Sequence, residues 1–597
     1  MMSSKAVILN GCFLVVSLLF VHAEPVNILP DPLHQLQIKS SGPGAIETRI
    51  VSVSGNDFKE AIEAKTRQGT RWPYDNQLQA SVPVEVKNGD VVLAEFSIRA
   101  LASTSESGEA KTQMCFEQKG GEFVKSIVYD AGVGKSWKRF QIPFRVQGAK
   151  SGAYGPNEAQ ICFRLGYQGQ TIQIGGIRFA NYGPEQNIAS LPATRLDYAG
   201  REPEAAWRIE AAKRIETLRK ALLAVHVVDS SGNPVPGAAV YVQMKKSAFH
   251  FGSAVDLRYF SGKTPDALKY RQFVLDHFNQ ITPENDLKWN AWEWDSAQRG
   301  NVLQALGDLK ANGMRIHGHC LIWPGFSRMP VDAEGLISNR EALDKRIAGH
   351  FTEIMKLTQG MIDDWDVVNE PYAERDILDQ YGDSLVGDWF ALAHGIDPVP
   401  ILYLNDYANF QNGGDDTAHK EDFESRIKKL LVEKIPVQGI GMQSHFGSVL
   451  CPPEAALKEL DRFAKLGLPI QITEFDVDTE DEQLKSDFTR DFMTLCFSHP
   501  AVIGFSCWGF WEGKHWKPAA AMIRKDWSIT PWGKIWLDLV ENEWSTRASG
   551  TSNASGDYQI KGFLGDYIVI VKLGDKEVSA PLSLRKDSPV LQIQMDR

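Results

Sequence analysis

The sequence predicts a multi-domain protein with a central (β/α)8 barrel, an N-terminal β-sandwich of jelly-roll type, and small β-sandwich elements flanking the barrel. Three observations support this fold class. The chain has 597 residues, more than one ordinary domain needs, and 43% of them are hydrophobic. Apolar runs alternate with helical segments across residues 246–545. Strand patterns without helices fill residues 24–185.

Residues 1–23 have the pattern of an export signal. Lys5 supplies the positive charge, an apolar run follows, and the run "VHA" that ends at Ala23 fits a cleavage site. The apolar run is short for a membrane span, so we expect cleavage, with an uncleaved anchor as the alternative. The mature protein is therefore expected to be secreted or periplasmic.

Residues 24–185 alternate apolar and polar residues in short runs that Gly, Ser, Asn and Asp separate, which is typical of a two-sheet sandwich. The clearest of these runs are 90–101, 138–146, 159–167 and 171–183. Cys115 and Cys162 lie in such runs and either form a disulfide or remain buried thiols. Residues 186–223 are expected to form a linker with a helix, because residues 203–223 have helical spacing and many charges.

Residues 224–245 read as a β-hairpin with a Ser-Gly-Asn-Pro turn. Residues 546–597 hold further short strands with Gly turns. The two pieces together resemble the small sandwich of carboxypeptidase regulatory-like domains, so we expect one β module that the barrel interrupts. The alternative is a separate hairpin at each end.

The barrel prediction depends on eight apolar runs at intervals of roughly 30 to 40 residues, because strands buried on both faces give continuous apolar runs. The runs are 249–256, 280–289, 315–323, 363–371, 400–407, 437–446, 469–477 and 502–511.

Polar and aromatic residues gather where these strands end. In a (β/α)8 barrel the carboxyl ends of the strands carry the chemistry, so these side chains are expected in one cleft. They are Glu284, Asn285 and Lys288; His317, His319 and Trp323; Asn369 and Glu370; Asn405, Asp406 and Tyr407; Gln443 and His445; Glu474 and Asp476; and Trp508, Trp511 and Trp516.

Two carboxylates in such a cleft suit glycoside hydrolysis, which needs an acid for the leaving oxygen and a second carboxylate at the anomeric carbon. We expect desolvation among tryptophans to keep Glu370 protonated. A polar network with His445 and Asp476 should keep Glu474 ionised. A separation of about 5–5.5 Å would make the reaction retaining.

The composition excludes other classes. A net charge of −11 without basic blocks argues against nucleic acid and against anionic membranes. The sequence has no Gly-rich phosphate loop and no Cys, His or Asp cluster with metal-ligand spacing, so we expect no cofactor and no metal.

The barrel resembles glycoside hydrolase family 10, the endo-β-1,4-xylanases. The runs "TPENDLKW", "GHCLIW", "WDVVNEP", "LNDY", "GIGMQSH", "ITEFDV" and "WGFWEGKHW" occur in the family's order. The resemblance implies that Glu370 is the acid/base, that Glu474 is the nucleophile, and that Asn369, His445 and Asp476 support them. It implies sugar contacts by Glu284, Asn285, Lys288, His319, Trp323, Tyr407, Gln443, Trp508 and Trp516. Pro324, Glu512 and Asp286 depart from the family pattern.

The resemblance implies xylan as the substrate, and we expect a monomer. A β-1,4- or mixed-linkage glucanase and a non-catalytic polysaccharide-binding protein are the alternatives. The sandwich at 24–185 is similar in architecture to carbohydrate-binding modules, with Trp72, Tyr74 and Trp137 as candidate stacking platforms. Trp137 also fits a core position, and the region could be a spacer.

Overall fold

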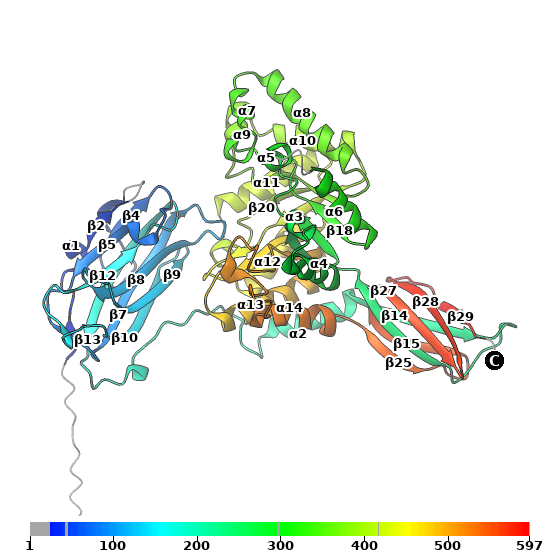
Figure 1. Cartoon of the computed structure of the whole chain (residues 1–597), viewed down its shortest axis with the longest axis horizontal. Helices are drawn as coiled ribbons and strands as arrows, with labels where there is room; N and C mark the ends of the chain where they lie inside the picture. Colours follow the sequence, from blue (N-terminus) through cyan, green and yellow to red (C-terminus); the bar gives the residue numbers. More distant parts are fainter. Residues whose placement is uncertain (1–23, 42–45, 295–298, 416, 596–597) are drawn as a thin grey trace, which may run out of the picture.

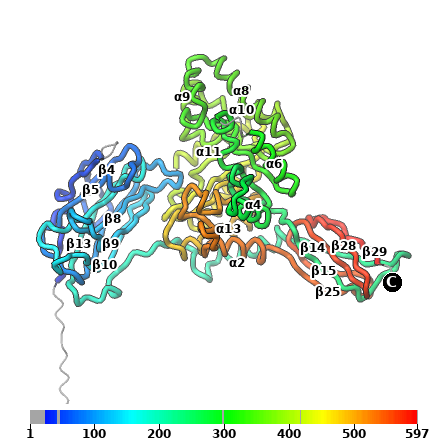
Figure 2. Tube along the Cα trace, in the orientation of Figure 1, coloured from blue at the N-terminus to red at the C-terminus, as the bar shows by residue number. Residues whose placement is uncertain are grey.

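The computed structural model describes residues 24–41, 46–294, 299–415 and 417–595, which form three modules. The N-terminal sandwich stands beside the central barrel, and a small β module extends from the barrel's other side (Figures 1 and 2). The expected export signal at residues 1–23 lies outside the described residues. Among those that are described, no helix is both long enough and apolar enough to span a membrane.

The N-terminal module is the predicted β-sandwich. One sheet has the strand order β10-β7-β13-β4-β3 with β1 added on β13, and the other has the order β2-β5-β12-β8-β9. Phe96 packs on Phe140 and on Phe163 between the sheets. The strands are β1 (Val26–Asn27), β2 (Gln37–Ser40), β3 (Glu47–Ser52), β4 (Glu60–Thr66), β5 (Asn76–Ser81), β6 (Val86–Lys87), β7 (Val91–Ser103), β8 (Ala110–Gln118), β9 (Lys125–Val133), β10 (Lys138–Arg145), β11 (Ala153–Tyr154), β12 (Ala159–Arg164) and β13 (Gln170–Asn181).

The two cysteines of the sandwich are free thiols. Cys115 and Cys162 are direct cross-strand partners in the β8–β12 ladder, and both are buried and unbridged. Of the two alternatives that the sequence left open, the structure therefore has buried thiols. Burial raises the pKa of the Cys115 thiol to about 12, so it stays protonated at neutral pH.

The linker helix is shorter than the sequence predicted. Helix α2 spans Ala206–Leu218, and the residues from Lys220 onward already belong to strand β14 (Lys220–Val228). The prediction of helix up to residue 223 was wrong because the apolar residues at the end of the segment alternate toward a sheet, where they pair with β26. Trp207, Ala211 and Ile215 form the buried face of α2.

The small β module is built from chain on both sides of the barrel. Strand β14 pairs with β26 and β29, and β15 pairs with β25 and β27. Valines of β15 and β27 fill its interior, among them Val240, Val242, Val569 and Val571. The remaining strands are β15 (Ala239–Ser247), β25 (Arg547–Thr551), β26 (Asp557–Phe563), β27 (Gly565–Leu573), β28 (Lys576–Leu584) and β29 (Leu591–Gln594).

The central module is a closed parallel barrel, as predicted. Its strands follow the order β21-β20-β19-β18-β17-β16-β24-β23, and pairing between β21 and β23 closes the ring. Each strand falls within one of the eight predicted apolar runs. The strands are β16 (His250–Val255), β17 (Gln280–Pro283), β18 (Arg315–Gly318), β19 (Asp364–Asn369), β20 (Ile401–Asp406), β21 (Gly439–Met442), β23 (Ile470–Val477) and β24 (Val502–Cys507), with β22 (His445–Phe446) beside β23.

Helices surround the barrel and cover its strands. Side-chain caps begin several of them: Thr264 accepts from the Ala267 N–H at α4, and Asp481 accepts from the Leu484 N–H at α13. The helices are α3 (Leu257–Phe260), α4 (Pro265–His277), α5 (Trp289–Trp294), α6 (Arg299–Ala311), α7 (Val331–Gly335), α8 (Arg340–Leu357), α9 (Asp376–Tyr381), α10 (Leu385–Ile396), α11 (Ala418–Val432), α12 (Pro453–Ala464), α13 (Glu482–Ser498) and α14 (Pro531–Leu537).

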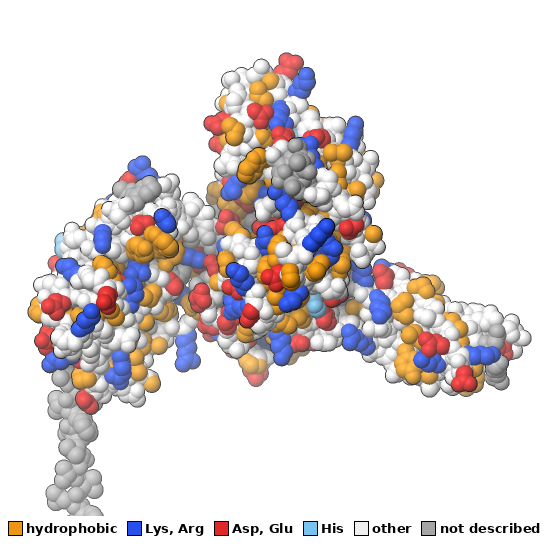
Figure 3. Space-filling view, in the orientation of Figure 1, with side chains coloured by type: hydrophobic (Ala, Val, Ile, Leu, Met, Phe, Trp, Pro, Cys, Tyr) orange, Lys and Arg blue, Asp and Glu red, His pale blue; other side chains and the backbone are white. Residues whose placement is uncertain are grey.

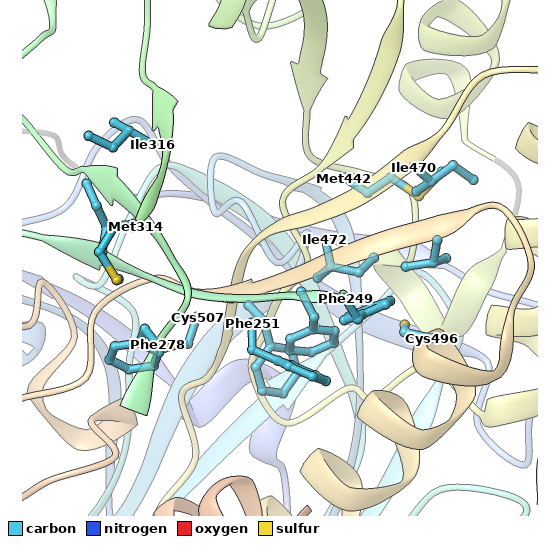
Figure 4. Close-up of a cluster of buried hydrophobic side chains, with 14 of the residues drawn as sticks. Phe249, Phe251, Phe278, Met314, Ile316, Met442, Ile470, Ile472, Cys496 and Cys507 are labelled. Carbon is cyan, nitrogen blue, oxygen red and sulfur yellow. The ribbon is translucent and has the colours of Figure 1, made fainter. Parts of the chain in front are cut away.

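Aromatic side chains fill the core around the first barrel strand. Phe249 and Phe251 lie with ring centroids 4.9 Å apart, and they belong to the same cluster of buried hydrophobic side chains as Ile472 (Figure 4). Phe251 also packs on Trp544, which follows α14 and brings the end of the barrel back against its first strand. On the face shown in Figure 3, acidic and basic side chains are interspersed over the modules, as expected for a chain without basic blocks.

Candidate active site

Two glutamates lie at the carboxyl ends of barrel strands β19 and β23, which β20 and β21 separate in the ring. Glu370 directly follows β19 and Glu474 lies in β23, and both side chains are buried, at 7% and 4% exposure. The backbone at Glu370 has φ of +52°, in the left-handed region that residues other than Gly seldom adopt. Strained backbone of this kind concentrates at functional sites.

A chain of side-chain amides joins the two glutamates. Gln443 Nε2 donates to Glu370 Oε1 at 2.8 Å, and Asn369 Nδ2 donates to the same oxygen at 3.2 Å. Asn405 Nδ2 donates both to Asn369 Oδ1 at 2.9 Å and to Glu474 Oε1 at 2.8 Å. The carboxylates therefore have fixed positions relative to each other.

The position of Asn405 depends on a glycine in the next strand. Gly441 is the direct partner of Asn405 in the β20–β21 ladder, and a Cβ at Gly441 would lie 2.3 Å from Asn405 Oδ1. Thr473 Oγ1 donates to the same Oδ1 at 2.8 Å. Because the amide oxygen is held by Thr473, the amide nitrogen points to Glu474.

Glu370 lies in an environment that favours its protonated form. Burial raises the pKa of Glu370 to about 8, against the opposing effect of the hydrogen bond from Gln443. The carboxylates of Asp406, Glu474 and Glu106 raise it further. A carboxyl group with this pKa is neutral at pH 7 and can donate a proton.

Glu474 lies beside a histidine that is paired with a second carboxylate. His445 Nε2 is 3.3 Å from Glu474 Oε2, and His445 Nδ1 is 3.1 Å from Asp476 Oδ2. Burial lowers the pKa of His445, but Asp476 and Glu474 outweigh burial and raise it to about 9. Trp516 Nε1 also donates to Asp476 Oδ2, at 2.8 Å. Glu474 therefore has a protonated imidazole beside it at neutral pH.

His319 and His317 share one aspartate inside the barrel. Asp366 Oδ2 lies 2.8 Å from His319 Nδ1, and Asp366 Oδ1 lies 2.9 Å from His317 Nε2. Burial lowers the pKa of His317, but Asp366 and Asp364 outweigh burial and raise it to about 10. The expectation that His317 lies at the mouth was wrong: it is within β18 and points into the barrel, where these two carboxylates pair with it.

A second group of predicted residues lines the mouth near β17. Lys288 Nζ donates to Asn285 Oδ1 at 2.9 Å and lies 5.3 Å from the Trp323 ring centroid. Burial raises the pKa of the neighbouring Glu284. Asn285, Lys288 and Trp323 line a cavity of about 870 Å³ that extends past Arg328. Hydrogen-bonding groups around an indole ring suit a sugar.

Tyr407 lies on the opposite side of the mouth, after β20. Burial raises its pKa, and the Glu370 carboxylate is the next largest cause. Its ring packs edge-on against His419 at 4.5 Å, and His419 Nε2 is 2.8 Å from Asp406 Oδ1.

The predicted tryptophans differ in their placement. Trp508 packs against His319 with centroids 5.1 Å apart, and Trp516 packs against His445 at 4.9 Å. Trp511 is instead stacked between Tyr259 and Trp527, within the aromatic packing outside the catalytic pair. Its assignment to the cleft was wrong, because this stack buries the ring.

Sequence reasoning missed residues that hold the site together. Three such residues were not singled out. Asp366 contacts His319, Thr473 contacts Asn405, and Lys517 contacts Asp476. Asp366 had a signal, because a charged residue inside the otherwise apolar strand "WDVV" requires a partner. In the described part of the chain, no group of three or more His, Cys, Asp and Glu is arranged to hold a metal ion.

Comparison with known proteins identifies a family. The model of the family described as "Glycosyl hydrolase family 10" matches residues 241–530. Endo-1,4-beta-xylanase B of Thermotoga neapolitana is 30% identical over 318 residues, which is 50% of this chain and 87% of that protein. A crystal structure of xylanase 10B from Thermotoga petrophila with xylobiose is 25% identical, with a TM-score of 0.46 over 50% of this chain and 95% of that one.

A further relative carries a different kind of name. The protein named Anti-sigma-I factor RsgI6, from Acetivibrio thermocellus, is 31% identical over 399 residues, which is 65% of this chain. The chain spans 49% of that relative's length and 48% of Endo-1,4-beta-xylanase 1 of Arabidopsis thaliana.

Proposed function

Because the chain belongs to glycosyl hydrolase family 10, we propose that it hydrolyses internal β-1,4-xylosidic linkages of xylan with retention of configuration. In this proposal Glu370 is the acid/base and Glu474 is the nucleophile. The observation that carries it is the contrast between two glutamates that one chain of amides joins: Glu370 faces carboxylates, and Glu474 faces a protonated His445.

The first step forms a glycosyl-enzyme. Glu474 attacks the anomeric carbon, the bond to the leaving oxygen breaks, and Glu370 gives its proton to that oxygen. Glu370 holds this proton at neutral pH because its pKa is about 8. His445 Nε2 lies 3.3 Å from the attacking carboxylate, and Asp476 raises the pKa of His445, so that the imidazole stays charged.

The second step uses Glu370 as a base. Once Glu474 is esterified it carries no charge, so one of the causes that raise the pKa of Glu370 is removed. The Glu370 carboxylate then accepts a proton from water as the water oxygen attacks the anomeric carbon and releases Glu474. Both glutamates return to their starting states, and the product keeps the substrate's configuration.

Two other functions remain as alternatives. A β-1,4- or mixed-linkage glucanase would use the same two glutamates on a sugar with one more hydroxymethyl group. A polysaccharide-binding protein without turnover is the second candidate.

The test is reducing-sugar release from xylan and from barley β-glucan by the wild type, Glu370→Ala and Glu474→Ala. We expect release from xylan that both substitutions abolish. Release from β-glucan alone would support the glucanase. Binding to xylan without release from either polymer by the wild type would support the binding protein.

We propose that the sandwich also binds polysaccharide. Trp72 and Tyr74 are 49% and 46% exposed, and their rings are stacked with nearly parallel planes and centroids 6.1 Å apart. Trp137 packs on Phe58 at 5.1 Å, which fits a structural role. In a Glu474→Ala background, a Trp72→Ala/Tyr74→Ala pair should reduce retention on insoluble xylan, whereas unchanged retention would make this region a spacer.

We further propose export through residues 1–23 and a monomeric mature protein. N-terminal sequencing of the protein recovered outside the cytoplasm, and its mass in solution, would test these two points. An intact N-terminus on a membrane fraction would instead support the uncleaved anchor.

A further inference from the structure

One turn of the N-terminal sandwich reaches the mouth of the barrel. Residues 103–109 connect β7 to β8, and Gln411 Nε2 donates to the backbone oxygen of Glu106 at 2.6 Å. Gln411 lies four residues beyond Tyr407, in the loop that follows β20. At Gly108, with φ of +72°, a Cβ would lie 2.9 Å from the Gln411 side chain. The turn and the loop are therefore in close contact.

A buried carboxylate fixes this turn. Glu109 is 1% exposed, and it accepts a hydrogen bond from the Val449 N–H in the loop after β22. A Cβ at Gly447 would lie 2.4 Å from Glu109 Oε2, so this glycine makes room for the carboxylate. Lys111 adds an ion pair with Asp478 at 2.8 Å. These contacts hold the turn in one position against the barrel.

A cavity of about 220 Å³ lies between the turn and the barrel loops that follow β22 and β24. The sandwich lines it with Ser105, Glu106 and Gln168, and the barrel lines it with Phe446 and Lys517. Phe446 directly follows His445 in the sequence, and Lys517 follows Trp516. The Lys517 ammonium lies 3.9 Å from Asp476 Oδ1. The cavity therefore adjoins the site that holds Glu474.

The strand order places this cavity at one particular end of the cleft. The cavity that Asn285 and Lys288 line is at β17. The cavity beside the turn is elsewhere: Phe446, which lines it, lies in β22, and Gln411, which contacts the turn, follows β20. In the closed ring β17 and β21 are separated by three strands on either side, so the two cavities are on opposite sides of the mouth. Glu106 is among the charges that raise the pKa of both Glu370 and Tyr407, as expected for a carboxylate on the proton donor's side.

We propose that the turn 103–109 forms a wall of the leaving-group half of the cleft, where Ser105 and Glu106 bind hydroxyl groups of the xylan chain. This inference rests on the proposed function. A carboxylate and a hydroxyl side by side can accept from and donate to neighbouring pyranose hydroxyls. In the part of the chain that the structure describes, the Glu106 carboxylate forms no ion pair, so it is available for a sugar.

The test compares xylo-oligosaccharides of increasing length. The substitutions are Glu106→Gln, which removes the charge, and Glu106→Trp, which fills the cavity. The matched control is Glu122→Gln, whose exposed side chain pairs with Lys150. Glu122 lies beyond the far end of β8, and at about 3.3 Å per residue this strand places it about 30 Å from the turn. The measured quantity is the ratio of kcat/KM for xylohexaose to kcat/KM for xylotriose, because only the longer substrate extends into the cavity.

We expect this ratio to fall about 3- to 10-fold in Glu106→Gln, the loss typical of one hydrogen bond, and more than 10-fold in Glu106→Trp. Glu122→Gln should keep the wild-type ratio. The thermal midpoint of each variant shows whether it folds. If Glu106→Trp misfolds, the kcat/KM ratio of Glu106→Gln alone tests the inference.

Two negative results are distinguishable. In the first, the wild type is active and its ratio of kcat/KM for xylohexaose to kcat/KM for xylotriose is within twofold of the ratios of Glu106→Gln and Glu106→Trp. This result would overturn the inference and leave the proposed function in place. A wild type that cleaves no xylo-oligosaccharide would overturn the proposed function and the inference with it.

Discussion

The ends of β19 and β23 each present a buried glutamate to the same cleft, but their neighbours differ in charge. Glu370 accepts hydrogen bonds from the neutral amides of Gln443 and Asn369, and the charged groups that act on it are carboxylates. Glu474 accepts from Asn405 and lies beside His445, which Asp476 keeps protonated.

This difference separates the roles of two chemically identical side chains. Burial favours protonation of Glu370, because a desolvated carboxylate loses its hydration. The charged imidazole of His445 lies beside Glu474, whereas the carboxylates near Glu370 raise the pKa of Glu370 further. The partners therefore assign the proton to Glu370, and four substitutions or conditions would break or sharpen this assignment.

The largest expected effect comes from removing the nucleophile. Glu474→Ala should lower kcat/KM by about 10⁴-fold or more, on xylan and on aryl β-xylobiosides alike, because no other group can form the covalent intermediate. Initial rates on both substrates measure this. Glu433→Ala, an exposed glutamate at the end of α11, is the control. A loss below tenfold would assign the nucleophile to another residue.

Loss of the acid should depend on the leaving group. Glu370→Gln should cost about 10²- to 10⁴-fold on xylan, whose leaving oxygen needs a proton. An aryl β-xylobioside with an acidic phenol needs little help in the first step, so it should give a burst of phenol followed by slow turnover. Stopped-flow absorbance measures the burst. Equal losses on both substrates, with no burst, would contradict the acid role.

The amide bridge gives the next largest effect. Gly441→Ala places a Cβ where the Asn405 side chain lies and should lower kcat by about 10- to 100-fold, because small displacements of catalytic groups are costly. Gly307→Ala in α6, where a Cβ meets open space, is the matched control and should keep wild-type kcat. Wild-type kcat in Gly441→Ala would show that Asn405 does not position the pair.

The smallest expected effect is on stability. The folded-state pKa of Glu370 is about 8, above its ordinary value of 4.5, so its stabilising contribution is complete below pH 4.5 and is lost as the pH rises to 8. The thermal midpoint of Glu370→Gln minus that of the wild type should therefore increase by a few °C from pH 5 to 8.5 and then level off. Scanning calorimetry across this range measures it, and a difference independent of pH would place the pKa of Glu370 near its ordinary value.

Much of the fold could be predicted from local pattern. Each barrel strand is an apolar run buried on both faces, so its position followed from hydrophobicity alone. The end of the linker helix could not be placed in the same way, because Lys220–Leu223 has the composition of either element and takes its conformation from pairing with β26. Trp511 was misplaced for a related reason: its ring is stacked between Trp527 and Tyr259, and Tyr259 comes from a distant part of the chain.

The sequence by itself determined the barrel, the order of its strands and the residues that stand at the strand ends, because period and spacing are local properties. Only the tertiary structure decided which partners those residues meet: the amide chain through Asn405, the shared Asp366 and the turn that carries Glu106. The charge state of a buried carboxylate depends on the groups within a few ångströms of it, and folding brings those groups together from separate strands and modules.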